Sequence, residues 1–208
     1  MSSYPRREKR KQKSREALIQ AALDLFASKG FEETTLDDIA SRADLHVQTL
    51  YRHFPTKNDL AVAIDRTRLE EFRELFADRK VSTLEFWRTW LIQTTEEWTK
   101  HGKQYRAFLT NLQTVPTIST TLIATWYSYE SLLEEGLRQD FGSEVDDPFP
   151  IMIACALWGG HRHAIYNWFI EGGTGDLTAA SVAVVDQVIT RFGAQFEAAR
   201  QIEIQSSS

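Results

Sequence analysis

The sequence has few of the residues that interrupt helices or that build cross-linked scaffolds. Its 208 residues include five prolines, ten glycines and one cysteine, Cys155. A single cysteine excludes an internal disulfide and fits a reducing compartment. Because helix-breaking residues are scarce and apolar residues recur at steps of three and four, we predict an all-α chain.

Long apolar runs are also missing. The first apolar run begins only at Ala17, so the N-terminus does not resemble a signal peptide. The uncharged segment 107–129 is long enough to cross a bilayer, but Asn111, Gln113, Pro116 and many hydroxyl residues make it too polar for a lipid-facing helix. We therefore expect a cytoplasmic protein with no membrane partner.

Charge is distributed unequally along the chain. The net charge is −5, yet residues 1–60 carry 11 Lys or Arg against 9 Asp or Glu, and residues 1–15 hold seven basic groups and one acid. A basic N-terminal segment followed by an acidic remainder is typical of a protein in which one end binds a polyanion. A solubilising flexible tail would explain the same pattern equally well.

The first sixty residues carry the signals of three short helices. Apolar residues recur at helical spacing from Leu18 to Phe26 and stop before Gly30. Thr35 with Asp38, and Thr56 with Asp59, form two capping boxes that begin helices. A further helix is expected over 47–53, and the tight turn before it predicts a helix-turn-helix.

Longer helices follow, at about 59–78, 83–100, 103–114, 117–140, 148–171 and 178–201. We divide the chain into a basic flexible arm at 1–13, a helix-turn-helix domain at 14–60, a larger helical domain at 61–203 and a disordered tail at 204–208.

The helix at 47–53 carries many hydrogen-bonding side chains on one side. Leu50 and Phe54 are four residues apart and should face the small core. The Gln48 amide can make a bidentate contact to adenine, and Val47 and the methyl group of Thr49 can pack on a thymine methyl. This mixture of side chains makes chemical sense against DNA.

Two motifs in this region, TTLDDIA at 34–40 and TLYRHF at 49–54, followed by Lys57 and Leu60, closely resemble the DNA-binding domain of TetR-type transcriptional regulators. The resemblance covers about residues 14–62. It implies that the larger helical domain binds a ligand and dimerises. The resemblance implies that Val47, Gln48 and Thr49 approach bases and that Thr35, Tyr51, His53 and Lys57 bind phosphates. Arg52, on the same helix, is a further candidate DNA-binding residue.

Three features depart from the usual pattern of that family. Asp44 stands where the turn commonly has glycine, and His46 stands where serine commonly caps the recognition helix. The pair Asp37 and Asp38 could repel DNA, although carboxylates in a first helical turn usually complement the helix dipole. The basic start could add phosphate contacts or place an arginine in the minor groove, or it could be a disordered tail.

Aromatic residues interspersed with polar ones mark the larger domain. Apolar walls with a few polar groups are typical of a small-molecule site in a helical bundle, although the same aromatics could simply fill a core. We expect an apolar or aromatic effector. The candidate ligand-binding residues are Trp87, Trp90, Gln93, Thr94, Trp98, Phe108, Asn111, Trp126, Tyr129, Trp158 and His161.

Metal binding and catalysis have weak support. His161 and His163 are two residues apart, so on a helix they diverge and cannot readily share a metal. With no nucleophile motif and no phosphate-binding glycine loop, we expect neither an enzyme nor a cofactor.

Apolar stripes near the C-terminus suggest an interface. The resemblance implies that the last two helices pair across a two-fold axis. The candidate interface residues are Trp168, Val185, Val188, Ile189, Phe192 and Phe196. The alternative is that these stripes face the core of a single chain.

These observations favour a homodimeric repressor that a small molecule releases from a palindromic operator in double-stranded DNA. Two alternatives remain. One is an architectural or nonspecific DNA-binding protein without a ligand, and the other is a helical small-molecule binder with a disabled DNA-binding head.

Overall fold

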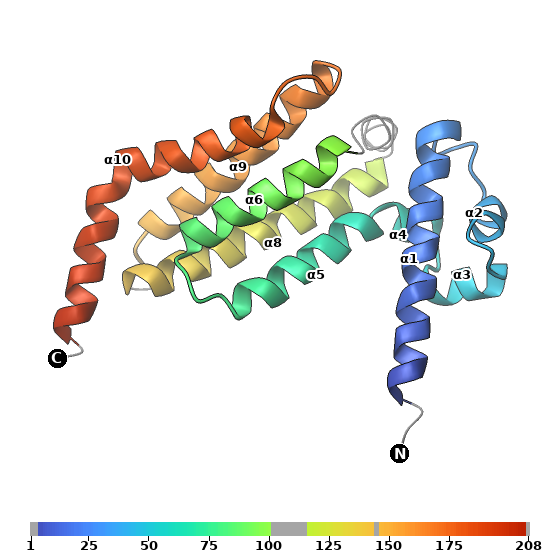
Figure 1. Ribbon diagram of the computed structural model, residues 1–208, viewed down its shortest axis with the longest axis horizontal. Helices are drawn as coiled ribbons and strands as arrows, with labels where there is room; N and C mark the ends of the chain where they lie inside the picture. The colour runs from blue at the N-terminus through green and yellow to red at the C-terminus, as the bar shows by residue number, and fades with distance from the viewer. Residues whose placement is uncertain (1–3, 101–115, 144–145, 207–208) are drawn as a thin grey trace. The chain divides into compact units, whose positions relative to one another are not determined.

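In the computed structural model, which describes residues 4–100, 116–143 and 146–206, every described element is a helix (Figure 1). The all-α prediction is confirmed. The chain divides into two compact units, and the boundary between them falls inside two helices, between Arg68 and Leu69 and between Ile123 and Ala124.

The first unit is a small helical domain around one core. Helix α1 (Tyr4–Lys29) packs against α2 (Leu36–Arg42), α3 (Val47–His53) and α4 (Lys57–Ala61). Leu18 and Phe26 of α1, Ile39 of α2 and Leu50 of α3 are fully buried. The predicted apolar spacing therefore brings these side chains into one core, which supports α3.

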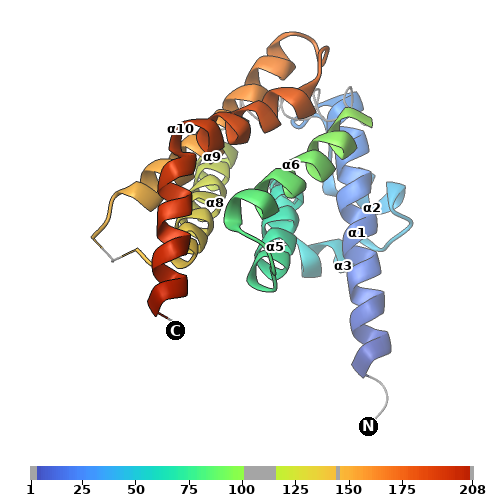
Figure 2. The same cartoon turned by 60° about the vertical axis from the view of Figure 1, so that its left-hand side comes forward.

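Helix α1 differs from the sequence prediction at its start. The flexible arm expected over residues 1–13 is corrected, because the chain is helical from Tyr4. Lys, Arg, Gln and Glu are good helix formers, and Gln12 donates to Glu16 one turn later at 2.9 Å. Residues 7–13 are all exposed, so this part of α1 extends beyond the core (Figures 1 and 2).

The second unit is a bundle of longer helices. It contains α5 (Ala63–Ala77) from Leu69 on, α6 (Thr83–Lys100), α8 (Pro116–Phe141) from residue 124 on, α9 (Phe149–Ile170) and α10 (Leu177–Ser206). Helix α10 packs along α9 and α6. At Gly160 of α9 an added Cβ would lie only 2.5 Å from a methyl group of Val184, so α9 and α10 approach closely there.

Helix ends differ from prediction at two further places. The single helix expected over 59–78 is interrupted at Val62, which caps the C-terminus of α4. Helix α10 continues to Ser206, so the tail expected to be disordered from 204 is helical up to that residue. The helix expected over 103–114 lies outside the described residues. None of the described helices combines the length and apolar character needed to cross a bilayer.

Candidate functional site

The turn between α2 and α3 accommodates two of the departures from the usual motif, Asp44 and His46. Asp44 adopts a left-handed conformation with φ of 53°, which aspartate tolerates better than most residues. The Nδ1 atom of His46 accepts a hydrogen bond from the backbone N–H of Gln48 at 3.2 Å. His46 thus performs the capping role for which serine is more usual.

Helix α3 has one buried side and one exposed side. Leu50 is fully buried and Phe54, which caps the C-terminus, is nearly so. Gln48, Tyr51 and Arg52 are exposed, whereas Val47, Thr49 and His53 are half-buried. The predicted base-reading and phosphate-binding side chains of α3 therefore share the surface of one firmly anchored helix.

The start of α2 is capped as predicted. The Thr35 hydroxyl accepts from the backbone N–H of Asp38 at 3.1 Å, and the Asp38 carboxylate accepts from the Thr35 N–H at 3.1 Å. Lys29 donates to the same carboxylate at 2.7 Å. The bond from Lys29, followed by those from Thr35, lowers the pKa of Asp38 to about 2. The charge of Asp38 is thus balanced within the protein, while Thr35 stays exposed.

Lys57 differs from the prediction that it binds a phosphate. Its ammonium donates to the backbone carbonyl oxygens of Phe31, Glu32 and Thr34 at 2.7, 3.2 and 3.2 Å. An ammonium group has three N–H donors, so these bonds engage all of them. We correct its role to that of a clamp on the loop between α1 and α2.

His53 lies at the end of α3 among positive charges. Burial lowers its pKa first, and the charges of Lys11, Arg15 and Arg52 lower it further. The neutral imidazole is therefore favoured, and it retains one N–H donor for a phosphate oxygen.

In the second unit, four of the predicted ligand-binding residues lie together. The rings of Tyr129 and Trp158 stack with centroids 4.5 Å apart, and Trp87 lies 6.0 Å from Trp158. His161 contacts both tryptophans at 5.8 Å. These rings come from α6, α8 and α9.

Polar atoms are buried inside this aromatic cluster of Trp87, Tyr129, Trp158 and His161. His161 Nδ1 lies 3.0 Å from the hydroxyl of Ser181, and burial lowers the pKa of His161 to about 3. The indole N–H groups of Trp87 and Trp158 are buried and find no hydrogen-bond acceptor among the described residues. A buried donor without an acceptor costs free energy, so both N–H groups would gain from an acceptor on a bound molecule.

The other predicted ligand-binding residues are placed differently. Trp90 is buried against Phe72, with ring centroids 5.3 Å apart, and Thr94 is buried on the same helix. Trp98 packs on Phe169, and Trp126 lies under Arg162. Gln93 is exposed, so its assignment to an enclosed site is wrong, because its face of α6 points to solvent. Phe108 and Asn111 lie outside the described residues.

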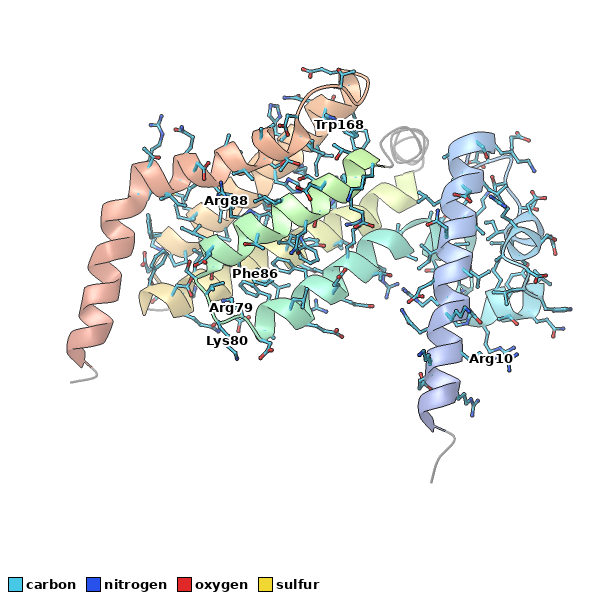
Figure 3. The ribbon with its side chains drawn as sticks, in the orientation of Figure 1. Arg10, Arg79, Lys80, Phe86, Arg88 and Trp168 are labelled. Atoms are coloured by element: carbon cyan, nitrogen blue, oxygen red, sulfur yellow. The ribbon has the colours of Figure 1, made fainter. Side chains whose placement is uncertain are left out.

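Three phenylalanines of the second unit were not among the predicted residues. The rings of Phe72 and Phe76 of α5 stack with centroids 5.2 Å apart, and the ring of Phe86 of α6 packs against both. Phe86 is labelled in Figure 3. The spacing of four residues between Phe72 and Phe76 on α5 was the available signal. Ser181, the partner of His161, is twenty residues away in sequence and carried no such signal.

The predicted dimer residues are only partly available for contact. Val185 and Val188 belong to the hydrophobic core of a single chain, and Trp168 is buried against Phe169 and Gly173, so these three assignments are corrected. Ile189 is exposed and Phe192 is half-buried. The side chain of Phe196 is not among those described.

A different apolar face of α9 is exposed instead. Met152, Tyr166 and Ile170 are each about half exposed or more, and they share one side of α9 with Ala156 and His163. This side faces away from α10, because Leu157, His161 and Trp168 on the other side are buried. We call the set Met152, Ala156, His163, Tyr166 and Ile170 the outer face of α9. Within the described part of the chain, no group of three or more His, Cys, Asp or Glu is arranged to hold a metal ion.

Comparison with known proteins agrees with the geometry of the first unit. Residues 18–64 match the family model for bacterial regulatory proteins of the tetR family. The chain is 27% identical over 186 residues to the HTH-type transcriptional regulator TcmR of Streptomyces glaucescens, which covers 85% of this chain and 82% of TcmR.

Solved structures share the fold of most of the chain. SmeT, the repressor of the Stenotrophomonas maltophilia multidrug efflux pump SmeDEF, in a complex with triclosan, has a TM-score of 0.66 at 19% identity, covering 86% of this chain and 90% of SmeT. The transcriptional regulator FadR of Bacillus subtilis, in complex with stearoyl-CoA, has a TM-score of 0.65 at 16% identity, covering 84% of this chain and 97% of FadR.

The motif, the capped helix-turn-helix and the larger helical domain therefore agree with the family match. Such proteins act as DNA-binding regulators and not as enzymes. Residues 18–64 therefore carry the DNA-binding domain of the tetR family of bacterial regulatory proteins, and the chain is similar to a regulator of this kind over most of its length.

Proposed function

We propose that this regulator is a homodimeric repressor that binds a palindromic operator and leaves it when a small, largely apolar or aromatic molecule binds. The observation that carries the proposal is the exposed polar surface of α3, held on the buried side by Leu50 and Phe54. A short helix anchored in this way can enter the major groove without losing its orientation.

Roles follow from the side-chain chemistry on that surface. Gln48 offers both a donor and an acceptor for adenine, and Val47 and Thr49 offer methyl groups to thymine. Tyr51, Arg52 and the neutral His53 donate to phosphate oxygens, as does Thr35 at the start of α2. Lys57 acts indirectly, because it holds the loop that precedes α2.

Two copies would meet through the outer face of α9, joined by Ile189 on α10. An exposed apolar stripe along one helix suits an isologous contact, in which the same patch is used by both copies. Such a dimer binds successive major grooves if its two α3 helices lie roughly 34–36 Å apart.

The effector would bind at the aromatic cluster of the second unit. Trp87, Tyr129 and Trp158 supply aromatic faces, and the two unpartnered indole N–H groups supply donors. The SmeT and FadR structures contain triclosan and stearoyl-CoA, a chlorinated aromatic compound and a long-chain acyl thioester. Both ligands combine a large apolar part with hydrogen-bond acceptors.

Helix α5 belongs to both compact units, since its residues up to Arg68 fall in the first and the rest in the second. Its tilt could therefore set the spacing of the two reading helices. A ligand releases the repressor only if it binds more tightly to a state in which the distance between the two α3 helices does not match successive major grooves. We place this regulator in the cytoplasm, where its DNA partner is.

Selection of bound fragments from a random pool of double-stranded DNA tests the proposal, with the full-length protein at near-physiological salt. An enriched palindrome is expected. Salt-sensitive binding without an enriched sequence would favour the architectural alternative. No binding at all would favour a small-molecule binder whose helix-turn-helix domain does not bind DNA. The capped start of α3 and the left-handed conformation of Asp44, which aspartate tolerates, argue against that outcome.

A further inference from the structure

The N-terminal turns of α1 have no part in the core of the first unit. The buried residues of this helix begin at Leu18, and residues 7–13 are exposed. These exposed turns are rich in Lys and Arg, with Arg10 among the basic side chains drawn in Figure 3. Because α1 is one continuous helix from Tyr4 to Lys29, the spacing of these charged residues sets the side of the helix on which each lies.

One side of this extension points toward the end of α3. Lys11, Arg15, Leu18 and Ala22 are spaced at i, i+4, i+7 and i+11, so they share one face of α1. Leu18 and Ala22 are buried in the core that α3 also enters. Lys11 and Arg15 continue the same face beyond the core.

Contacts of Arg15 fix this arrangement. Its Nη1 donates to the Thr67 hydroxyl at 2.7 Å, and its guanidinium carbon lies 5.5 Å from the ring centroid of Phe54, the residue that caps α3. Neither partner carries a charge. The positive charge of Arg15 is therefore held beside the C-terminal end of the recognition helix without being neutralised.

Three positive charges lie near the end of α3. Arg15 is held beside Phe54, Arg52 precedes Phe54 by two residues, and Lys11 lies one turn before Arg15 on the same face of α1. The charges of all three lower the pKa of the half-buried His53. Among the described residues none of the three cations is paired with a carboxylate, and the acid nearest along this face of α1 is the exposed Glu8, one turn before Lys11. Like charges gathered without a counter-ion repel one another, so the cluster favours an anion bound between them.

We propose that Lys11, Arg15 and Arg52 form a phosphate-binding site around His53, which the extended α1 completes for the DNA backbone beside the bases that α3 reads. This inference rests on the DNA-binding function proposed above. The bound group is a phosphodiester of double-stranded DNA, contacted without regard to base sequence. This phosphate site would give a function to the exposed basic residues that extend α1 beyond the core of the first unit.

The test compares Lys11→Gln with Lys13→Gln in the full-length protein. Both variants remove one positive charge from an exposed position of α1, but Lys13 lies on the opposite side of the helix from Arg15. Fluorescence anisotropy would measure binding to a labelled duplex of random sequence and to any duplex enriched by selection, over a series of salt concentrations. Circular dichroism would check that each variant is folded.

We expect Lys11→Gln to weaken binding to both duplexes several-fold and to reduce the slope of log K against log salt by about 1. Lys13→Gln should leave the slope close to that of the wild type. Equal slopes for the two variants would overturn the phosphate site and leave the DNA-binding function standing. Failure of the wild type to bind either duplex would overturn both proposals.

Discussion

The ammonium of Lys57 donates to the carbonyl oxygen of Phe31 at 2.7 Å and lies 4.3 Å above the centroid of the same residue's ring. With the further bonds to Glu32 and Thr34, this ties the start of α4 to the loop before α2. Lys57 therefore supports the helix-turn-helix from inside, in contrast to the exposed residues of α3 that we propose contact DNA.

We expect Lys57→Met to destabilise the first unit by about 1–3 kcal/mol, because charge-assisted hydrogen bonds and a cation–π contact are lost. Urea unfolding would measure the loss. DNA binding at low temperature should keep the salt dependence of the wild type. A smaller salt slope with unchanged stability would instead identify Lys57 as a direct phosphate ligand.

Gln48→Ala should relax the choice of base at one position of each half-site and cost about 1–3 kcal/mol on the preferred sequence. Tyr51→Phe, which removes only a hydroxyl from an exposed ring, should weaken binding to all sequences alike. Selections repeated with each variant distinguish these effects. If Gln48→Ala keeps the wild-type preference at every position, our assignment of the reading face is wrong.

Burial of His161 should make the stability of the second unit depend on pH. Its pKa is lowered to about 3 in the folded chain, below the ordinary value of about 6.5, so the unfolded chain takes up a proton first as pH falls. The neutral, buried His161 makes its full contribution to the free energy of unfolding above about pH 6.5. This contribution is lost progressively toward about pH 3, by up to about 1.4 kcal/mol for each pH unit.

Chemical unfolding at about pH 7 and about pH 5.5 would measure this dependence. Between these values, wild-type protein should lose about 1 kcal/mol more than His161→Gln. Equal losses for wild type and His161→Gln would show that burial of His161 does not set the pH dependence.

Replacement of Tyr166 by Glu should convert dimers to monomers, because it places a charge at the centre of an apolar contact. The matched control is Leu75→Glu on α5, where an apolar side chain is similarly exposed but lies outside the outer face of α9. Sedimentation velocity would report the oligomeric state. A dimer that survives Tyr166→Glu would place the interface elsewhere.

Local signals in the sequence predicted the first unit well. The capping boxes at Thr35 and Thr56 and the inward positions of Leu50 and Phe54 depend on residues no more than four apart. Such contacts form within one or two turns of the same segment, so their geometry follows from spacing. The left-handed Asp44 and the cap at His46 are local for the same reason.

Contacts between distant segments were decided only by the tertiary structure. Val185 and Val188 form an apolar stripe that suits a core or an interface equally, and packing against α9 and α6 selected the core. Lys57 found carbonyl partners more than twenty residues away, and His161 paired with Ser181 across two helices. The sequence by itself determined which helices form and which α3 residues point outward, because those depend on local periodicity. Which apolar and polar side chains meet depends on how helices pack, and only the folded chain decides that.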